Sequence, residues 1–117
     1  MRFAPPDAAA LLLALLLSVA GATAAQDDAL VVGWLEYDTL VRDIDEVTAT
    51  KADAFLARHR DQAVGLAFRE RWLAELARRG EWRAFLAAWT PAIEDPALRC
   101  HALNARAATG SHGGDWN

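Results

Sequence analysis

Cysteine is almost absent from this 117-residue chain, in which Cys100 is the single example. An internal disulfide is therefore excluded. We expect Cys100 to be buried as a small hydrophobe, because it shares one face of the last expected helix with Leu103 and Ala107. The alternative is an exposed thiol that pairs with another chain.

An excess of positive charge is also lacking. The formal net charge is -4, which argues against a nucleic-acid partner. Residues 27–61 hold nine acidic and four basic side chains, and we interpret them mainly as a solvated face. With 54% hydrophobic residues, the composition predicts one folded domain rather than a disordered chain.

The spacings typical of metal and nucleophile sites are missing. Cys100 and His101 are adjacent, so a helix would point them about 100° apart. His59 and His112 have no histidine partner four residues away, and no glycine-rich loop joins a strand to a helix. Ser111 and His112 fall in a tail without periodicity. We therefore expect no catalytic residue, no cofactor-binding residue and no metal ligand.

Paired carboxylates could act in glycosidic cleavage if one of them lay in an apolar pocket. Glu70, Glu75 and Glu81 instead stand among arginines. Arg69 is next to Glu70, and Arg71 precedes Glu75 by four residues, which predicts solvated ion pairs.

Tryptophans could stack on sugars, but most of them fall on apolar helix faces and are expected to be core. They are Trp34, Trp72, Trp82 and Trp89.

The N-terminus has the pattern of a secretory signal peptide over residues 1–25. Arg2 precedes an apolar run from Ala8 to Leu17, and small residues end in Ala24 and Ala25. The apolar run is shorter than the roughly 20 residues of a spanning helix. We expect an exported, periplasmic protein with no membrane segment after cleavage, a helical domain over 26–109 and a disordered tail over 110–117.

Residues 66–89 have the pattern of a helical hairpin. In its first helix Leu66, Leu73 and Leu76 lie close to one stripe, with Phe68 and Trp72 beside them. Gly80 can end that helix in the left-handed conformation. A second apolar face follows at i, i+3, i+4 and i+7: Trp82, Phe85, Leu86 and Trp89.

Three further helices are expected. The first covers 29–44, although Val31, Val32 and Gly33 leave a short strand as an alternative. The second covers 49–59, with Phe55 and Leu56 as anchors and a capping-box-like spacing of Thr50 and Asp53.

The third starts at Asp95, a good N-cap before Pro96, and ends at Gly110. No segment after residue 25 alternates like a strand, so the fold class is all-α. Ala54-Phe55-Leu56-Ala57 recurs as Ala84-Phe85-Leu86-Ala87, which suggests antiparallel hairpins in a short α-solenoid fragment.

Four stretches resemble the N-terminal superhelical, U-shaped part of soluble lytic murein transglycosylases over residues 30–109. They are Gly33-Trp34-Leu35-Glu36-Tyr37, Phe55-Leu56-Ala57-Arg58, the segment 71–86 and Ala97-Leu98-Arg99-Cys100. The resemblance implies a scaffold from a family that cleaves glycosyl bonds of periplasmic peptidoglycan and forms an anhydro sugar.

The family's catalytic Glu-Ser motif and its Gly-Leu-Met-Gln-type loop do not occur in this sequence. We therefore expect a non-catalytic, truncated or frame-shifted member, with peptidoglycan or a cell-wall protein as partner. The alternative is a small periplasmic helical-repeat interaction module. Such a module would self-associate through its unfinished solenoid face.

Overall fold

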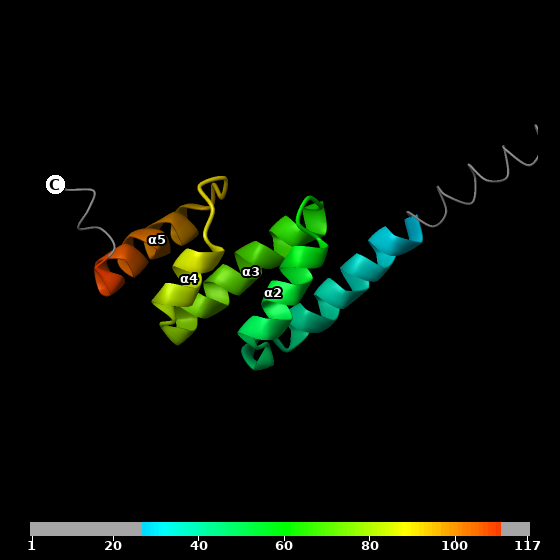
Figure 1. Cartoon of the computed structure of the whole chain (residues 1–117), viewed down its shortest axis with the longest axis horizontal. Coiled ribbons are helices and arrows are strands. Elements are labelled where there is room, and N and C mark those ends of the chain that lie inside the picture. Colours follow the sequence, from blue (N-terminus) through cyan, green and yellow to red (C-terminus); the bar gives the residue numbers. More distant parts are fainter. Residues whose placement is uncertain (1–26, 111–117) are drawn as a thin grey trace, which may run out of the picture. The chain divides into compact units, whose positions relative to one another are not determined.

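The computed structural model describes residues 27–110 (Figure 1). The predicted signal peptide and most of the predicted tail lie outside these residues. The chain divides into two units, residues 1–35 and 36–117. Residues 27–42 are helical, so the strand alternative at residues 31–33 is wrong.

The remaining elements belong to the second unit. They are the 3-10 helix η1 (Ile44–Glu46) and the α-helices α2 (Ala49–Arg58), α3 (Ala63–Arg79), α4 (Trp82–Ala88) and α5 (Pro96–Thr109). Every regular element within residues 27–110 is helical, which confirms the all-α fold class. In that range no helix is long and apolar enough to cross a membrane.

Helix α3 organises the second unit, because η1, α2, α4 and α5 all contact it. A short turn over 59–62 joins α2 to α3, and Gly80 joins α3 to α4, so both pairs pack as hairpins (Figure 1). Gly80 has φ 72°, and its N–H bonds back to the end of α3, as the sequence predicted.

The buried side chains of the second unit form one cluster between the helices. Its hydrophobic members are Val47, Ala52, Phe55, Leu56, Val64, Phe68, Trp72, Leu73, Leu76, Phe85, Ala88, Ile93, Leu98, Ala102 and Ala105. Phe55 and Phe85, the matching residues of the repeated tetrapeptide, are both fully buried. They lie on α2 and α4, the two helices that flank α3.

One predicted core residue of α3 and one predicted core face of α5 are wrong. Leu66 is 48% exposed, because α3 packs through Phe68, Trp72 and Leu76 instead. The expected face of Cys100, Leu103 and Ala107 is exposed as well.

Helix α5 turns a different stripe inward, formed by Leu98, Ala102 and Ala105 at i, i+4 and i+7. Alanine-rich helices have several stripes of similar hydrophobicity, so packing against α4 decided which one was buried.

The predicted ends of α5 are confirmed, whereas the predicted cap of α2 is wrong. Asp95 caps α5, with its carboxylate accepting from the Leu98 N–H at 3.0 Å, and Gly110 ends that helix at φ 76°. The Thr50–Asp53 capping box is wrong, because Thr48 caps α2 and its hydroxyl accepts from the Lys51 N–H. A cap needs extended backbone at its own position, and only Thr48 has it.

Candidate binding groove

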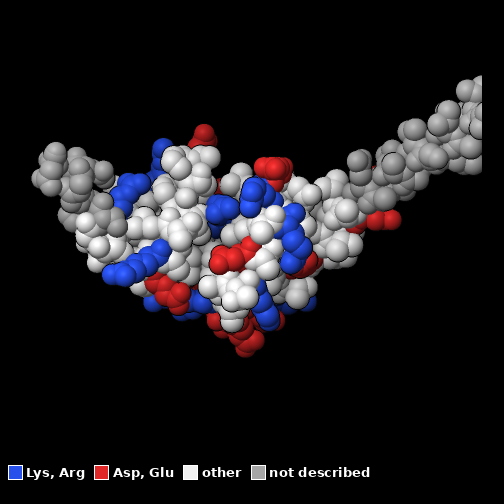
Figure 2. All heavy atoms as spheres, in the orientation of Figure 1, with Lys and Arg blue, Asp and Glu red and all other residues white. Residues whose placement is uncertain are grey.

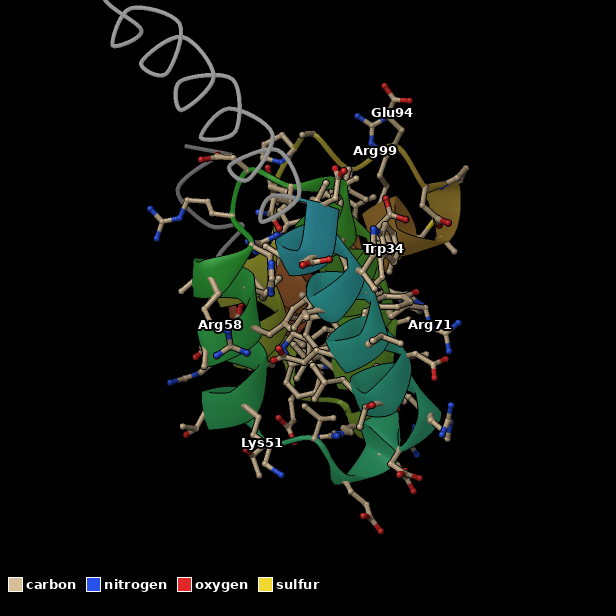
Figure 3. All side chains as sticks on the ribbon, turned by 90° about the vertical axis from the view of Figure 1, so that its right-hand side faces the viewer. Trp34, Lys51, Arg58, Arg71, Glu94 and Arg99 are labelled. Atoms are coloured by element: carbon tan, nitrogen blue, oxygen red, sulfur yellow. The ribbon has the colours of Figure 1, made fainter. Side chains whose placement is uncertain are left out.

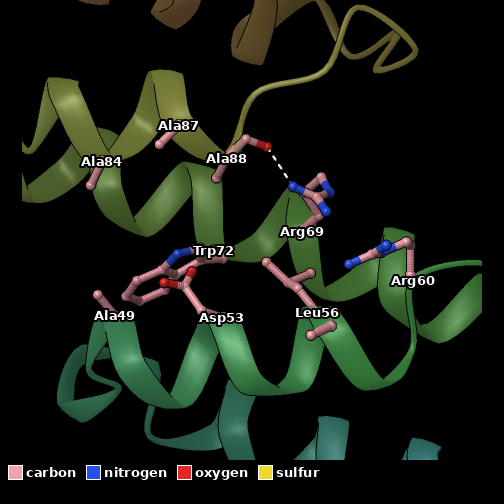
Figure 4. A pocket seen from close by; sticks show the side chains of 10 residues that line it. Ala49, Asp53, Leu56, Arg60, Arg69, Trp72, Ala84, Ala87 and Ala88 are labelled. Atoms are coloured by element: carbon pink, nitrogen blue, oxygen red, sulfur yellow. Dashed lines mark hydrogen bonds between the residues drawn. The ribbon is translucent and has the colours of Figure 1, made fainter.

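A groove lies between α2 and α4, with α3 as its floor (Figure 4). Its cavity volume is about 340 Å³, which falls within the range of small-ligand sites. The lining side chains come from the three helices and the turn after α2: Ala49, Asp53, Leu56, Ala57, Arg60, Arg69, Trp72, Ala84, Ala87 and Ala88.

The sequence places these residues by helical spacing. Ala49, Asp53, Leu56 and Arg60 recur every three or four residues, so they form one face of α2 and the turn after it. The opposite wall is made of alanines from α4. Side chains this short leave open space between two helices that both pack on α3.

The charged side chains of the groove are separated by sign. Arg60 and Arg69 line one end, and Asp53 lines the other end beside Trp72 (Figure 4). Arg69 is held in place, because its Nη1 donates to the Ala88 carbonyl oxygen at 2.7 Å. The groove therefore has a cationic end, an anionic end and an apolar middle.

A second cavity of about 390 Å³ adjoins the cationic end. It shares Leu56, Arg60 and Arg69 with the groove and adds Trp89 and Thr90. On the face drawn in Figure 2, acidic and basic side chains are intermixed. That face therefore has no large area of a single sign of charge.

Sequence reasoning missed Asp53, Arg60 and Arg69 as a group. In the sequence analysis Asp53 is interpreted as a helix-capping residue and Arg60 is not singled out. The signal was present, because residues 53, 56 and 60 share one helix face. Arg69 could not be added from the sequence, since its approach to Ala88 depends on how α3 packs against α4.

The prediction that Trp34 is a core residue is wrong, because it is 44% exposed, whereas Trp72, Trp82 and Trp89 serve mainly as core. Trp72 is only 2% exposed. Trp82 and Trp89 are half-buried and each packs against Phe85, with ring centroids 6.0 and 5.8 Å apart. The Trp72 ring is therefore not exposed for stacking on a sugar.

Glu75 is buried, which corrects its prediction as a solvated carboxylate. It pairs with Arg78 and Arg79 rather than with Arg71. Arg78 donates from Nε and Nη2 at 2.8 and 2.6 Å, and Arg79 donates from Nε at 2.7 Å. Helix packing turned the carboxylate toward the core and toward the last turn of α3, where both arginines stand.

Arg79 joins this ion pair to the segment before α2. Its Nη2 lies 2.9, 3.2 and 3.0 Å from the carbonyl oxygens of Ile44, Asp45 and Val47. Its guanidinium also lies over the Trp72 ring, 5.0 Å from the centroid. One side chain therefore satisfies a buried carboxylate and three backbone carbonyls.

These contacts lower the pKa of Glu75 from 4.5 to about 2. The hydrogen bond from Arg78 contributes most, burial opposes the shift, and the hydrogen bond from Arg79 lowers the pKa further. A carboxyl whose pKa is lowered by folding stabilises the protein above its unfolded pKa. That stability is lost as the pH falls toward the folded pKa.

We therefore expect acid to weaken the fold between about pH 4.5 and pH 2, with Glu75 contributing up to about 3 kcal/mol. Urea unfolding at a series of pH values would measure this loss. Glu75→Gln cannot titrate, so its stability should depend less steeply on pH in that window. Equal slopes for the two proteins would contradict the assignment.

The other candidate groups do not converge on a metal or nucleophile site. The His59 Nδ1 lies 2.7 Å from the Gln62 Oε1, whereas Cys100 is exposed. Within residues 27–110, no three histidine, cysteine, aspartate or glutamate residues are grouped to hold a metal ion. Ser111 and His112 lie outside the described residues.

His101 is the one side chain of the described region with a buried polar atom that lacks a hydrogen-bond partner, its Nδ1. The ring lies near Trp82 and Phe85 and lines a cavity of about 230 Å³. Glu70, whose carboxylate the sequence analysis considered, lines the same cavity.

Comparison with known protein families, curated proteins and solved structures finds no match for this chain. Functional interpretation therefore rests on the residues and their geometry.

Proposed function

We propose that this chain is a non-catalytic helical-repeat module of the cell envelope, related to the superhelical scaffold of murein lytic transglycosylases. In this proposal residues 1–25 direct it to the periplasm, and the groove between α2 and α4 binds peptidoglycan or a cell-wall protein. The observation that carries the proposal is the placement of the repeated Ala-Phe-Leu-Ala segments on α2 and α4, on either side of α3. Equivalent helices on either side of a shared neighbour are what a helical solenoid requires.

The resemblance in sequence supports the connection to murein. Its most specific stretch, residues 71–86, includes Trp72, Leu76 and Phe85, which are core residues. The stretch therefore supports kinship through the scaffold and carries no catalytic group with it. Glu75 belongs to this stretch, but its hydrogen bonds to Arg78 and Arg79 and its low pKa make it unsuitable as a general acid.

Co-sedimentation of the purified chain with murein sacculi tests the proposal. We expect the chain to bind the sacculi without releasing soluble anhydro-muropeptides, which chromatography would detect. Binding no stronger than that of an unrelated acidic protein would contradict the link to murein. Release of anhydro-muropeptides would contradict the non-catalytic assignment.

Self-association is a second candidate function, favoured by the outward face of α5. Leu103 is 63% exposed there and shares this face with the exposed Cys100. Another helix packed on this stripe would remove apolar surface from water. Light scattering of the chain and of its Leu103→Asp variant, over a range of concentrations, tests this candidate. A concentration-dependent dimer that the substitution abolishes supports this candidate, and a monomer at all concentrations contradicts it.

A further inference from the structure

The groove contains opposite charges that do not neutralise one another. Asp53 lies on α2, and Arg60 lies seven residues further along the chain, in the turn after that helix. In the described part of the chain, neither side chain makes an ion pair with any other residue. Both charges are therefore available to a ligand.

The cationic end is partly preorganised. Arg69 is half-buried, and its bond from Nη1 to the Ala88 carbonyl fixes the guanidinium at the wall of the groove. Arg60 points into the same end from the turn after α2 (Figure 4). Two guanidinium groups with forked N–H donors suit a carboxylate, and the fixed one loses little freedom when it binds.

The middle of the groove suits a small apolar side chain. Leu56 lies between Asp53 and Arg60 on the α2 side, and Ala84 and Ala87 line the α4 side towards Trp72 (Figure 4). No charged residue lines the groove between Asp53 and Arg60 on the α2 face. A ligand with charge along its whole length, such as a polyanion, would leave charge against this apolar stretch and against Asp53.

We propose that the groove binds a short peptide with free ends, its carboxylate at Arg60 and Arg69 and its ammonium at Asp53. A peptide of about three residues is the shortest that has a central side chain between its two charged ends, and its extended backbone advances about 3.3–3.6 Å per residue. The central side chain then packs on Leu56 and the alanines. This inference rests on the groove being the binding face proposed above, and it names the ligand class that the groove selects.

Titration of the purified ¹⁵N-labelled chain with the tripeptide Ala-Leu-Ala tests the inference. We expect amide shifts in residues 53–60 and 84–89. N-acetylation or C-amidation of the peptide should each weaken binding by about tenfold, because each removes one charged hydrogen-bonding group. Equal affinity for the three peptides, or no shifts at millimolar peptide, would overturn the inference.

Protein variants test which residue binds each end of the peptide. Asp53→Asn should weaken binding of the free tripeptide about tenfold but leave binding of the N-acetylated peptide unchanged, since that peptide has no ammonium. Arg60→Gln should likewise weaken binding of the free tripeptide about tenfold and leave binding of the C-amidated peptide unchanged, since that peptide has no carboxylate. Lys51→Gln is the matched control, because Lys51 is an exposed cation of α2 (Figure 3) that does not line the groove. A loss of affinity in Lys51→Gln equal to that in Arg60→Gln would show non-specific attraction and overturn the assignment.

The outcome also separates this inference from the murein proposal. Binding to sacculi without tripeptide binding overturns the ligand assignment alone. Tripeptide binding at the groove without binding to sacculi contradicts only the murein proposal.

Discussion

Replacing Arg79 with alanine is expected to lower the free energy of unfolding by about 3 to 5 kcal/mol. The Arg79 side chain is 19% exposed, and it pairs with Glu75, which is 6% exposed. The substitution removes one partner of a buried carboxylate and the donor shared by the Ile44, Asp45 and Val47 carbonyls. It also removes the guanidinium over Trp72. Urea unfolding followed by circular dichroism would measure the loss.

Arg78→Ala is the matched control for this prediction. Arg78 binds the same carboxylate with two hydrogen bonds, but its side chain is 64% exposed and makes no bond to the segment before α2. Solvent screens such a pair, so we expect a loss of about 1 kcal/mol. If the two substitutions cost the same, the backbone carbonyls contribute nothing and the role given to Arg79 is wrong.

Gly65→Ala is expected to destabilise the protein by about 3 kcal/mol, although alanine is the better helix former. A Cβ at this position would lie 2.0 Å from the His59 carbonyl oxygen. The obstacle is backbone, so α2 and α3 would have to move apart where their connecting turn brings them together. Thermal unfolding of the variant would show the loss as a lower melting temperature.

Ala74→Gly measures helix propensity alone in the same helix, since Ala74 is exposed on α3. We expect it to cost about 1 kcal/mol. If Gly65 were only a weak point of α3, Gly65→Ala would raise stability by a similar amount. A rise would therefore contradict the close approach of His59.

Local signals predicted the helices because each signal acts within a few residues. Gly80, Asp95 and Gly110 end or begin their helices as expected, since left-handed backbone and N-cap bonds are decided by the nearest turn. The start of α2 differs from the prediction only in which threonine caps it, because Thr48 rather than Thr50 has extended backbone.

Packing faces and the groove were harder to predict because they depend on contacts between distant segments. Glu75 looked solvated among arginines, yet its environment includes a partner that also binds residues 44–47. The face of α5 containing Cys100 looked as apolar as the face that was buried. Gly65 showed no signal, because its role depends on the His59 carbonyl opposite it.

The alanine wall of α4 has a consequence for how the groove could change. Phe85 on the same short helix faces the core and is fully buried, whereas Ala87 is exposed and faces the groove. A longer side chain at residue 87 would narrow the groove without adding volume to the core. Ligand selectivity and fold stability can therefore change separately on this helix, one substitution at a time.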